Sequence, residues 1–254
     1  MSEQVRVDLN CDVGESFGAW RLGDDQGVLD HVTSANVACG FHAGDPATME
    51  ATVRACKQRG VAVGAHPSYP DLTGFGRRSM RVEPADVEAM VLYQIGGLET
   101  IARANGVRLT HVKPHGALYN DAANDRGLAD AIVSAVRRAG IPRLYGLAGS
   151  AMVDAARAAG VAWAAEGFCD RAYAADGRLR SRTKAGAVFT DPAAAARQAV
   201  DIALRGSVRV DEDLEIALRA DTLCVHGDTP GAAGIARAVR AALESAGVRV
   251  AALE

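Results

Sequence analysis

The segment 109–116 carries three side chains that transfer protons or balance negative charge: His111, Lys113 and His115. Alternate residues of a strand face the same side, so a strand here would present all three on one face. Lysine and histidine are rarely buried without partners. Lysine is also scarce, since only three of the 28 Lys and Arg residues are lysine. A lysine placed between two histidines therefore predicts a functional site.

The same period of two places polar side chains on one face of other apolar runs. In the first run, Asp8, Asn10 and Asp12 oppose Val7 and Leu9. Further polar residues alternate with apolar ones in the later runs, and they are Asn36, His66, Glu166 and His226. These residues and the segment 109–116 would line one shared interior if the strands belong to one sheet.

Acidic and amide side chains gather where the first run ends, at Asp8, Asn10, Asp12 and Glu15. Carboxylates at alternate positions can share a hard cation, so this set resembles the ligands of a metal ion or of a magnesium nucleotide. The alternative is a strand end followed by the acidic residues of a turn.

Two loops predict anion recognition. Residues 36–45 end one strand and open a helix, whose free backbone N–H groups favour anions. We expect His42 to be functional there and Asp45 to be mainly an N-cap. Arg77, together with Arg78, suits a carboxylate or a phosphate, as do Asp170 and Arg171 together with the arginines that follow. A solvated charged face is the alternative for both groups.

The elements that position these residues alternate along the chain. Short apolar runs occur at 5–10, 35–39, 61–66, 109–113, 143–148, 161–168, 222–226 and 248–253. Helical patterns occur at 24–32, 46–59, 84–105, 121–139, 150–159, 192–205 and 230–246. Repeated β-α units imply a parallel sheet, and seven or eight of them favour a closed α/β barrel in a single domain, residues 1–254. The loops 67–83 and 169–190 would cover its mouth, and Asp176-Gly177 is a hairpin turn signal.

Such a barrel would have an unusual interior. Ordinary barrels are filled with bulky aliphatic side chains, whereas this interior would hold Asp, Asn, His, Lys and Glu. Burying those groups without partners costs about 2–7 kcal/mol each. The pattern therefore predicts a wet, deep ligand site at the carboxyl ends of the strands.

Composition excludes several classes of function. The net charge of −3 and the pI near 6.1 offer no general attraction to nucleic acid or to a membrane surface. No apolar run is long enough to span a membrane, and the first residues lack a signal-peptide pattern. Five widely spaced cysteines predict reduced thiols and a cytoplasmic location. The sequence has no P-loop and no nucleophile elbow.

Several motifs together resemble the LamB/YcsF family, which supplies the A subunit of prokaryotic 5-oxoprolinase. The motifs are residues 8–18, 35–45, 64–71, 112–119, 170–173 and 224–228, and the resemblance runs from about residue 5 to about residue 230. It implies a (β/α) barrel of the glycoside hydrolase/deacetylase type, often with seven strands. It also implies ATP-dependent opening of 5-oxo-L-proline to L-glutamate, with B and C subunits as partners.

The resemblance lets roles be assigned as hypotheses. Lys113 would neutralise phosphoryl charge, and Asp8 or Asp12 would hold Mg²⁺ with the nucleotide. The base that activates water would be Glu166, His66 or His226. Arg171 or Arg77 would bind the substrate carboxylate.

Two alternatives stay open. A deacetylase or amidohydrolase without ATP would bind a divalent metal through Asp12, His66 and His115. The other alternative is a subunit that binds substrate but contributes no chemistry.

Overall fold

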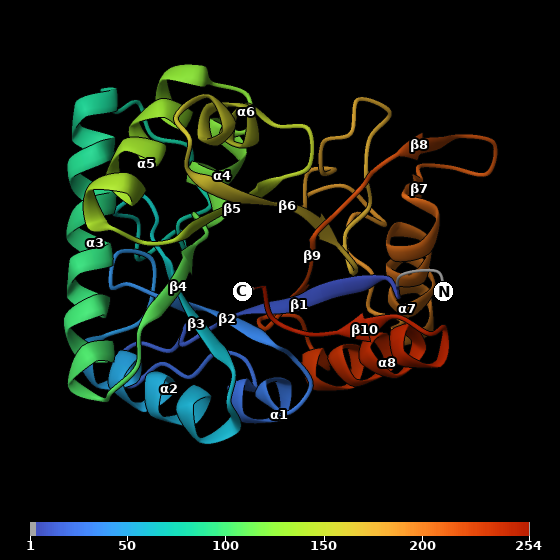
Figure 1. Ribbon diagram of the computed structural model, residues 1–254, viewed down its shortest axis with the longest axis horizontal. Helices are drawn as coiled ribbons and strands as arrows, with labels where there is room; N and C mark the ends of the chain where they lie inside the picture. The colour runs from blue at the N-terminus through green and yellow to red at the C-terminus, as the bar shows by residue number, and fades with distance from the viewer. Residues whose placement is uncertain (1–3, 254) are drawn as a thin grey trace.

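Seven parallel strands close into a barrel at the centre of the protein, in a computed structural model that describes residues 4–253 (Figure 1). The barrel strands are β1 (Arg6–Val13), β2 (Ser34–Ala38), β3 (Ala62–His66), β4 (Leu109–Val112), β5 (Arg143–Leu147), β6 (Ala162–Phe168) and β9 (Thr222–His226). Strand β9 pairs with both β6 and β1, which closes the ring. The predicted seven-stranded (β/α) barrel is confirmed.

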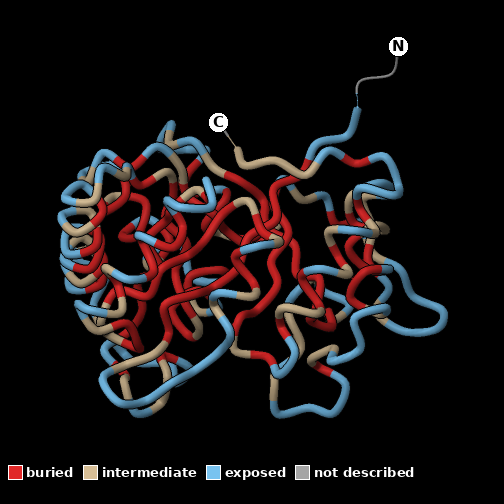
Figure 2. Tube along the Cα trace, turned by 90° about the horizontal axis from the view of Figure 1, so that it is seen from below, coloured by how far each residue is buried: buried red, intermediate tan, exposed pale blue. Residues whose placement is uncertain are grey.

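Helices surround the strands, with α7 and α8 on one side of the barrel in Figure 1. They are α1 (Asp25–Leu29), α2 (Pro46–Arg59), α3 (Pro84–Ala104), α4 (Gly116–Ala122), α5 (Arg126–Ala139), α6 (Ala151–Ala158), α7 (Pro192–Val200) and α8 (Ala232–Ser245). The predicted N-cap at Asp45 is confirmed, because its carboxylate accepts from the N–H groups of Ala47 and Thr48. Figure 2 shows the buried chain at the centre and the exposed chain on the outer helices.

Three predicted elements were wrong in extent. The pattern at 121–139 is interrupted by Asp125, which caps α5 through the N–H groups of Gly127 and Leu128. The pattern at 192–205 leaves α-helical geometry after Val200 and continues as a π-helical turn, η1 (Asp201–Arg205). The run 248–253 forms only the short strand β10 (Arg249–Val250), which pairs with the start of β1 outside the barrel ring.

A long insertion separates the last two barrel strands. Residues 169–221 contain α7, η1 and a hairpin of β7 (Ser207–Arg209) and β8 (Glu215–Ala217) that the sequence patterns did not predict. The first part of the insertion turns back at Asp176-Gly177, as predicted, so that Tyr173 pairs with Leu179. This part lies over the mouth of the barrel, where it contributes to a pocket.

The barrel interior is polar, as the period of two predicts. On β1, Asp8, Asn10 and Asp12 are at most 5% exposed, while Val7 and Leu9 on the other face belong to the apolar core. Strand register places the interior side chains in layers, with Asp8 level with Thr222 and Asp12 level with His226 in the strand pairing. The layer of Asp12 therefore lies nearer the carboxyl ends of the strands than the layer of Asp8.

Two further observations concern the helices and the cysteines. Among residues 4–253, no helix is both long and apolar enough to cross a membrane. All five cysteines are free and buried.

We expect Gly64→Ala to destabilise the barrel, because a Cβ there would lie 2.2 Å from Nε2 of His111. Overpacking of this kind costs about 1–3 kcal/mol. Gly96→Ala on α3 is the matched control, since its Cβ meets nothing within 4 Å. The control should gain up to about 1 kcal/mol from helix propensity. Urea denaturation measures both changes, and an equally stable Gly64→Ala variant would contradict the packing described here.

Candidate active site

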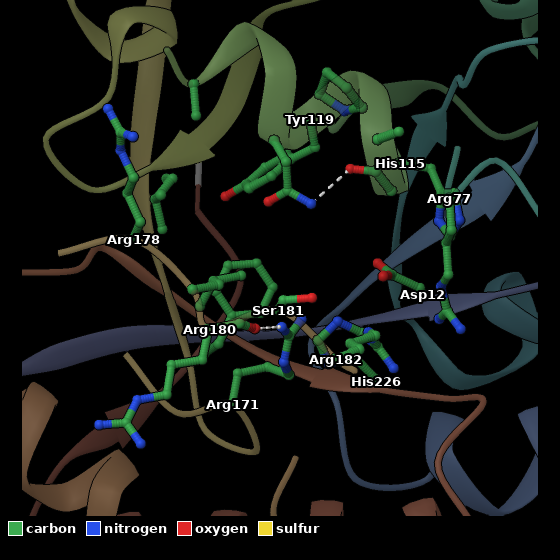
Figure 3. A pocket seen from close by; sticks show the side chains of 18 of the residues that line it. Asp12, Arg77, His115, Tyr119, Arg171, Arg178, Arg180, Ser181, Arg182 and His226 are labelled. Atoms are coloured by element: carbon green, nitrogen blue, oxygen red, sulfur yellow. Dashed lines mark hydrogen bonds between the residues drawn. The ribbon is translucent and has the colours of Figure 1, made fainter. Parts of the chain in front are cut away.

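A pocket of about 540 Å³ opens at the carboxyl ends of the strands (Figure 3). Its base is formed by polar ends of the barrel interior, among them Asp12, His66 and Lys113. Phe168 and Tyr119 line its wall. Arg171, Arg180 and Arg182 lie across the pocket from Tyr119 and His115 in Figure 3. The predicted deep ligand site therefore has a definite location.

Lys113 is held at the base of the pocket between two carboxylates. Its Nζ lies 2.9 Å from Oδ1 of Asp12 and 2.9 Å from Oε1 of Glu166. It also donates to Sγ of Cys224 at 3.0 Å. Burial acts to lower the pKa of Lys113, but the neighbouring carboxylates of Asp12 and Glu166 outweigh burial and hold the pKa well above its usual value. Lys113 is therefore a fixed ammonium ion.

Glu166 lies beneath the pocket wall and has no free oxygen. Oε1 accepts from Lys113 and from Nδ2 of Asn10, the latter at 3.0 Å. Oε2 accepts from the hydroxyl of Tyr119 at 2.7 Å. Glu166 is fully buried and does not line the pocket. These contacts make Glu166 a partner of Lys113 rather than a base for water.

Two amides tie the interior together. Nδ2 of Asn36 donates to Oδ1 of Asn10 and to Oδ1 of Asp12, both at 2.8 Å. Oδ1 of Asn36 accepts from Nε2 of His111 at 2.8 Å. Burial lowers the pKa of His111 to about 3, so this ring is neutral and stacks on Tyr145 with centroids 4.0 Å apart. His111 and Asn36 thus position the charged groups above them.

Three more histidines meet beside the pocket around Glu15. Nε2 of His66 faces Nδ1 of His115 at 2.9 Å, and Nδ1 of His115 lies 3.4 Å from Oε1 of Glu15. Nε2 of His42 lies 3.3 Å from the same oxygen. Burial lowers the pKa of His42 and of His115 well below the usual value, and burial raises the pKa of Glu15.

His226 is oriented by Asp170 on the other side of Asp12. Nδ1 of His226 donates to Oδ1 of Asp170 at 2.8 Å, and the backbone N–H of His226 donates to Oδ2 at 3.1 Å. The ring lines the pocket. A histidine whose Nδ1 is bound to a carboxylate presents its Nε2 lone pair, which is the arrangement of an oriented general base.

We expect Asp170→Asn to lower stability in a pH-dependent way. Burial acts to raise the pKa of Asp170, but the charge of His226 and its hydrogen bonds lower the pKa below the ordinary value. A carboxyl with a lowered folded pKa stabilises the protein above its unfolded pKa of about 3.9, and this contribution is lost as the pH falls through the folded pKa. The variant should lose about 1.5–3 kcal/mol at pH 7, and the difference from wild type should shrink below about pH 4.

Urea denaturation between pH 7 and pH 3.5 measures this dependence. Asp130→Asn is the control, because the carboxylate of Asp130 is exposed and pairs with Arg126 on the surface of α5. The control should change stability by less than about 0.5 kcal/mol. A pH-independent loss in Asp170→Asn would contradict the assigned ion pair.

The arginines at the mouth are not equivalent. Arg171 donates to the backbone oxygens of Ala187 and Arg180, so much of its guanidinium braces the insertion. Arg77 pairs with Asp228 at 2.6 Å, and Arg182 lies 3.9 Å from the same carboxylate. Arg77 and Arg182 are about one third exposed or less, and both line the pocket, so they can exchange Asp228 for an anionic ligand.

Asp8 lies deeper than the other predicted site residues. Its Oδ1 accepts from the hydroxyls of Thr33 and Ser34, and its Oδ2 accepts from those of Thr222 and Tyr145. It does not line the pocket. Four hydroxyl donors occupy its oxygens, so Asp8 does not fit a role as a ligand of nucleotide-bound Mg²⁺ in the pocket.

The structure thus brings most of the predicted residues to one place. Seven of them line the pocket: Asp12, His66, Arg77, Lys113, His115, Arg171 and His226. The others support that layer or lie apart from the lining. Tyr119 and Phe168 are lining residues that the sequence interpretation did not single out, whereas Arg180 and Arg182 are among the arginines expected to follow Arg171 at the site. Tyr119 lies in the first turn of α4, which begins directly after His115 at the mouth of the barrel, whereas the sequence pattern placed the helix start at residue 121.

Comparison with known proteins gives a consistent result. The model of the LamB/YcsF family matches residues 7–254. A protein from Chloroflexus aggregans that is named as the A subunit of 5-oxoprolinase is 56% identical over 247 residues, which cover 97% of this chain and 98% of the relative. A protein of the same name from Bordetella pertussis is 54% identical over 245 residues, which cover 96% of this chain and 97% of the relative.

Solved structures agree with the fold. The lactam utilization protein from Thermus thermophilus superposes with a TM-score of 0.91 at 50% identity, covering 98% of this chain and 100% of that one. A family 4 carbohydrate esterase from Streptomyces lividans has a TM-score of 0.51 at 13% identity, covering 98% and 93%. The similarity to the carbohydrate esterase concerns the fold alone.

Proposed function

Because this chain belongs to the LamB/YcsF family, we propose that it is the subunit of an ATP-dependent 5-oxoprolinase that opens 5-oxo-L-proline to L-glutamate. The relatives named as the A subunit of 5-oxoprolinase support the role within a multisubunit enzyme. The single observation that carries the proposal is the buried ammonium of Lys113 at the base of a pocket whose mouth is lined with arginines. Substrate, phosphate and water would meet between the ammonium of Lys113 and the arginines at the mouth of the pocket.

The reaction needs an activated amide, because a five-membered lactam is a poor electrophile. Transfer of the γ-phosphoryl group of ATP to the lactam oxygen gives an imidate phosphate and ADP. Water then attacks the ring carbon, and collapse of the tetrahedral adduct breaks the C–N bond to give γ-glutamyl phosphate. Hydrolysis of this acyl phosphate releases phosphate and L-glutamate. Negative charge develops on oxygen atoms in each step.

Lys113 is placed to counter that charge. Its ammonium is fixed by Asp12 and Glu166 before any ligand binds, so its orientation requires no rearrangement during the reaction. Arg77 and Arg182 at the mouth would bind phosphoryl oxygens or the substrate carboxylate once Asp228 releases them. Phe168, whose ring centroid lies 5.2 Å from Nζ of Lys113, gives the substrate ring an apolar wall.

His226 is the favoured base for water. Asp170 fixes its tautomer, so that Nε2 accepts a proton and Asp170 stabilises the imidazolium that forms. His226 lies on the strand next to β1, level with Asp12, close to the region that Lys113 faces. Both oxygens of Glu166 already accept hydrogen bonds, and Nε2 of His66 contacts His115. Neither residue is therefore placed as well as His226 to accept a proton from water.

The donor set also bears on Mg²⁺. Asp12 is the carboxylate of β1 that lines the pocket, and its Oδ2 lies 3.4 Å from Nε2 of His66, away from Lys113. Asp12 would therefore hold Mg²⁺ together with nucleotide phosphates, and the ion would neutralise phosphoryl charge when bound.

The test is glutamate release from 5-oxo-L-proline with MgATP, measured for this protein alone and with its candidate B and C partner subunits. Turnover that needs both ATP and the partners would support the proposal. A verified complex of folded subunits that releases no glutamate would overturn it. The surface variant Lys57→Met is the control for handling and assembly. In the wild-type protein, Nζ of Lys57 contacts the backbone oxygen of Asn105.

A metal-dependent amidohydrolase without ATP is kept as a second candidate because of one observation. Four side chains that can hold a metal ion, Glu15, His42, His66 and His115, converge beside the pocket. Hydrolysis of the lactam or of other cyclic amides without ATP, abolished by a chelator and restored by a divalent metal, would favour it. ATP-dependent turnover that survives the chelator, with excess Mg²⁺ restored, would exclude it.

A further inference from the structure

The pocket is larger than the lactam that the proposed function places in it. Pockets of about 300–1,000 Å³ hold ligands of drug size, whereas 5-oxo-L-proline is a single five-membered ring with one carboxylate. The volume of about 540 Å³ lies within that range. In Figure 3, Asp12 and Arg77 lie at one end of the pocket and Arg178 lies at the other. The proposed chemistry uses the end with Asp12, so the end with Arg178 is left for another part of the reactants.

The end near Arg178 lies between helix α4 and the hairpin at the start of the insertion. Helix α4 begins after His115 and passes Tyr119 toward this end in Figure 3. Ala123, the residue that follows α4, lines the pocket, and so does Leu179, which follows Arg178 in the hairpin. Apolar walls of this kind contact the faces of a ligand ring, while a few polar groups fix its orientation.

Two asparagine amides supply such polar groups beside the apolar walls. Nδ2 of Asn120 donates to the backbone oxygen of Gly116 at 3.0 Å, and Nδ2 of Asn124 donates to that of Asn120 at 2.9 Å. A carbonyl oxygen can only accept, so both amide NH₂ groups are fixed against the helix. Both Oδ1 atoms accept from no donor of residues 4–253, and both side chains line the pocket. The pocket therefore offers two acceptors four residues apart to a ligand that carries an amino group.

Arginines occupy the middle of the pocket, and one of them has a free donor. Arg171 and Arg182 lie between Arg178 and Arg77 in the view of Figure 3. Arg171 donates through Nε and Nη2 to backbone oxygens, while its Nη1 donates to no oxygen of residues 4–253. Burial and the charge of Arg182 lower the pKa of Arg171 to about 10, so the group stays charged at pH 7. A buried cation with a free N–H beside a second guanidinium favours an anion such as a phosphate group.

We propose that this chain itself binds the nucleotide of the reaction, with the base between α4 and the hairpin and the phosphates along the arginines toward Asp12. The inference rests on the proposed function and assigns the nucleotide to this chain rather than to a partner subunit. Asn120 and Asn124 select adenine, because its N6 amino group donates to their free Oδ1 atoms, whereas guanine presents the acceptor O6. Guanidinium groups take the place of the backbone N–H groups of a P-loop, which the sequence lacks.

The experiment is a calorimetric titration of the isolated chain with ADP, GDP and pyrophosphate, each with excess Mg²⁺. We expect one equivalent of ADP to bind and GDP to bind at least about 10-fold more weakly. Pyrophosphate should also bind, because it carries the phosphates without the base. The three ligands thus report separately on the two parts of the proposed site.

Variants assign each part to its residues. Asn120→Leu combined with Asn124→Leu should weaken ADP binding at least about 10-fold and leave pyrophosphate binding unchanged, which also shows that the double variant is folded. Arg182→Met should weaken both ligands by at least about 10-fold. The matched controls are Asn105→Leu at the end of α3, where the amide makes the same kind of backbone contact, and Arg126→Met on α5. Both controls should bind ADP as wild type does.

Three results would each overturn the inference: no binding of ADP at millimolar concentration, equal affinities for ADP and GDP, or a parallel loss of ADP and pyrophosphate in the double asparagine variant. The titration is separable from the oxoprolinase assay. Glutamate release by the complex, together with no ADP binding by this chain, would place the nucleotide on a partner and leave the proposed function standing. Selective ADP binding by this chain, together with a folded complex that releases no glutamate, would overturn the proposed function and leave the nucleotide site.

Discussion

Lys113→Met is expected to abolish turnover of the assembled enzyme, with a loss of at least about 10²–10³-fold in kcat. The ammonium of Lys113 is the fixed cation at the base of the pocket, and methionine has nearly the same length without the charge. Glutamate release from 5-oxo-L-proline with MgATP measures the loss. A folded variant with full turnover would contradict the role assigned to Lys113.

The same substitution has a predictable effect on stability. It leaves Asp12 and Glu166 buried without their common cation, and breaking a buried pair in this way costs about 3–5 kcal/mol. Adding Glu166→Gln removes one of the two uncompensated charges. The double variant should therefore recover part of the stability in urea denaturation while its activity stays lost. Recovery of both would indicate that Lys113 is structural only.

A matched pair of substitutions on β1 separates chemistry from architecture. Asp12→Asn is expected to lower kcat by about 10²-fold or more, because it removes the carboxylate that fixes Lys113 and lines the pocket. Asp8→Asn is expected to lower stability by about 1–3 kcal/mol, because an NH₂ group then faces hydroxyl donors. Its activity should follow the folded fraction. Both residues share one strand and one face, so the pair controls for local backbone effects.

Activity assays with urea denaturation of the same samples decide between the two assignments. If a fully folded Asp8→Asn variant is as inactive as Asp12→Asn, the sequence interpretation of Asp8 as a magnesium ligand regains support. Equal activity of Asp12→Asn and wild type would remove Asp12 from the site.

The period of two predicted the polar interior, because alternation of side chains is a property of any strand whatever its partners. It placed Asp8, Asn10 and Asp12 on one face correctly. It could not tell their depth, because depth depends on the stagger between strands. In the strand pairing, Asp12 lies opposite His226 and Asp8 lies opposite Thr222. This stagger explains why Asp12 reaches the pocket and Asp8 does not.

Loop geometry has no such period, and this is why the meeting of Glu15 with His42 could not be predicted. The two residues follow different strands, and a positive φ of 70° at Gly14 helps set the path of the first loop. The break at Asp125 was missed for a related reason. Apolar residues continue on both sides of it, so a capping side chain was the only signal of a new helix.

The closure of the ring has a consequence for how the protein is made. The strand that seals the barrel, β9, is separated from its neighbour β6 by residues 169–221 and is followed, up to residue 253, by one helix and a short strand. A chain emerging from the ribosome therefore holds six barrel strands before the seventh is available. Until then Asp8 lacks Thr222, and Lys113 lacks Cys224.

The growing chain would thus carry a polar core with some of its hydrogen-bond partners missing until β9 is available, whereas a barrel with an apolar interior can collapse earlier. Non-local pairings of this kind form slowly, and unpaired strand edges favour aggregation. The molecule completes its charged interior and its ligand pocket in one late event, when residues 222–226 become available to close the ring.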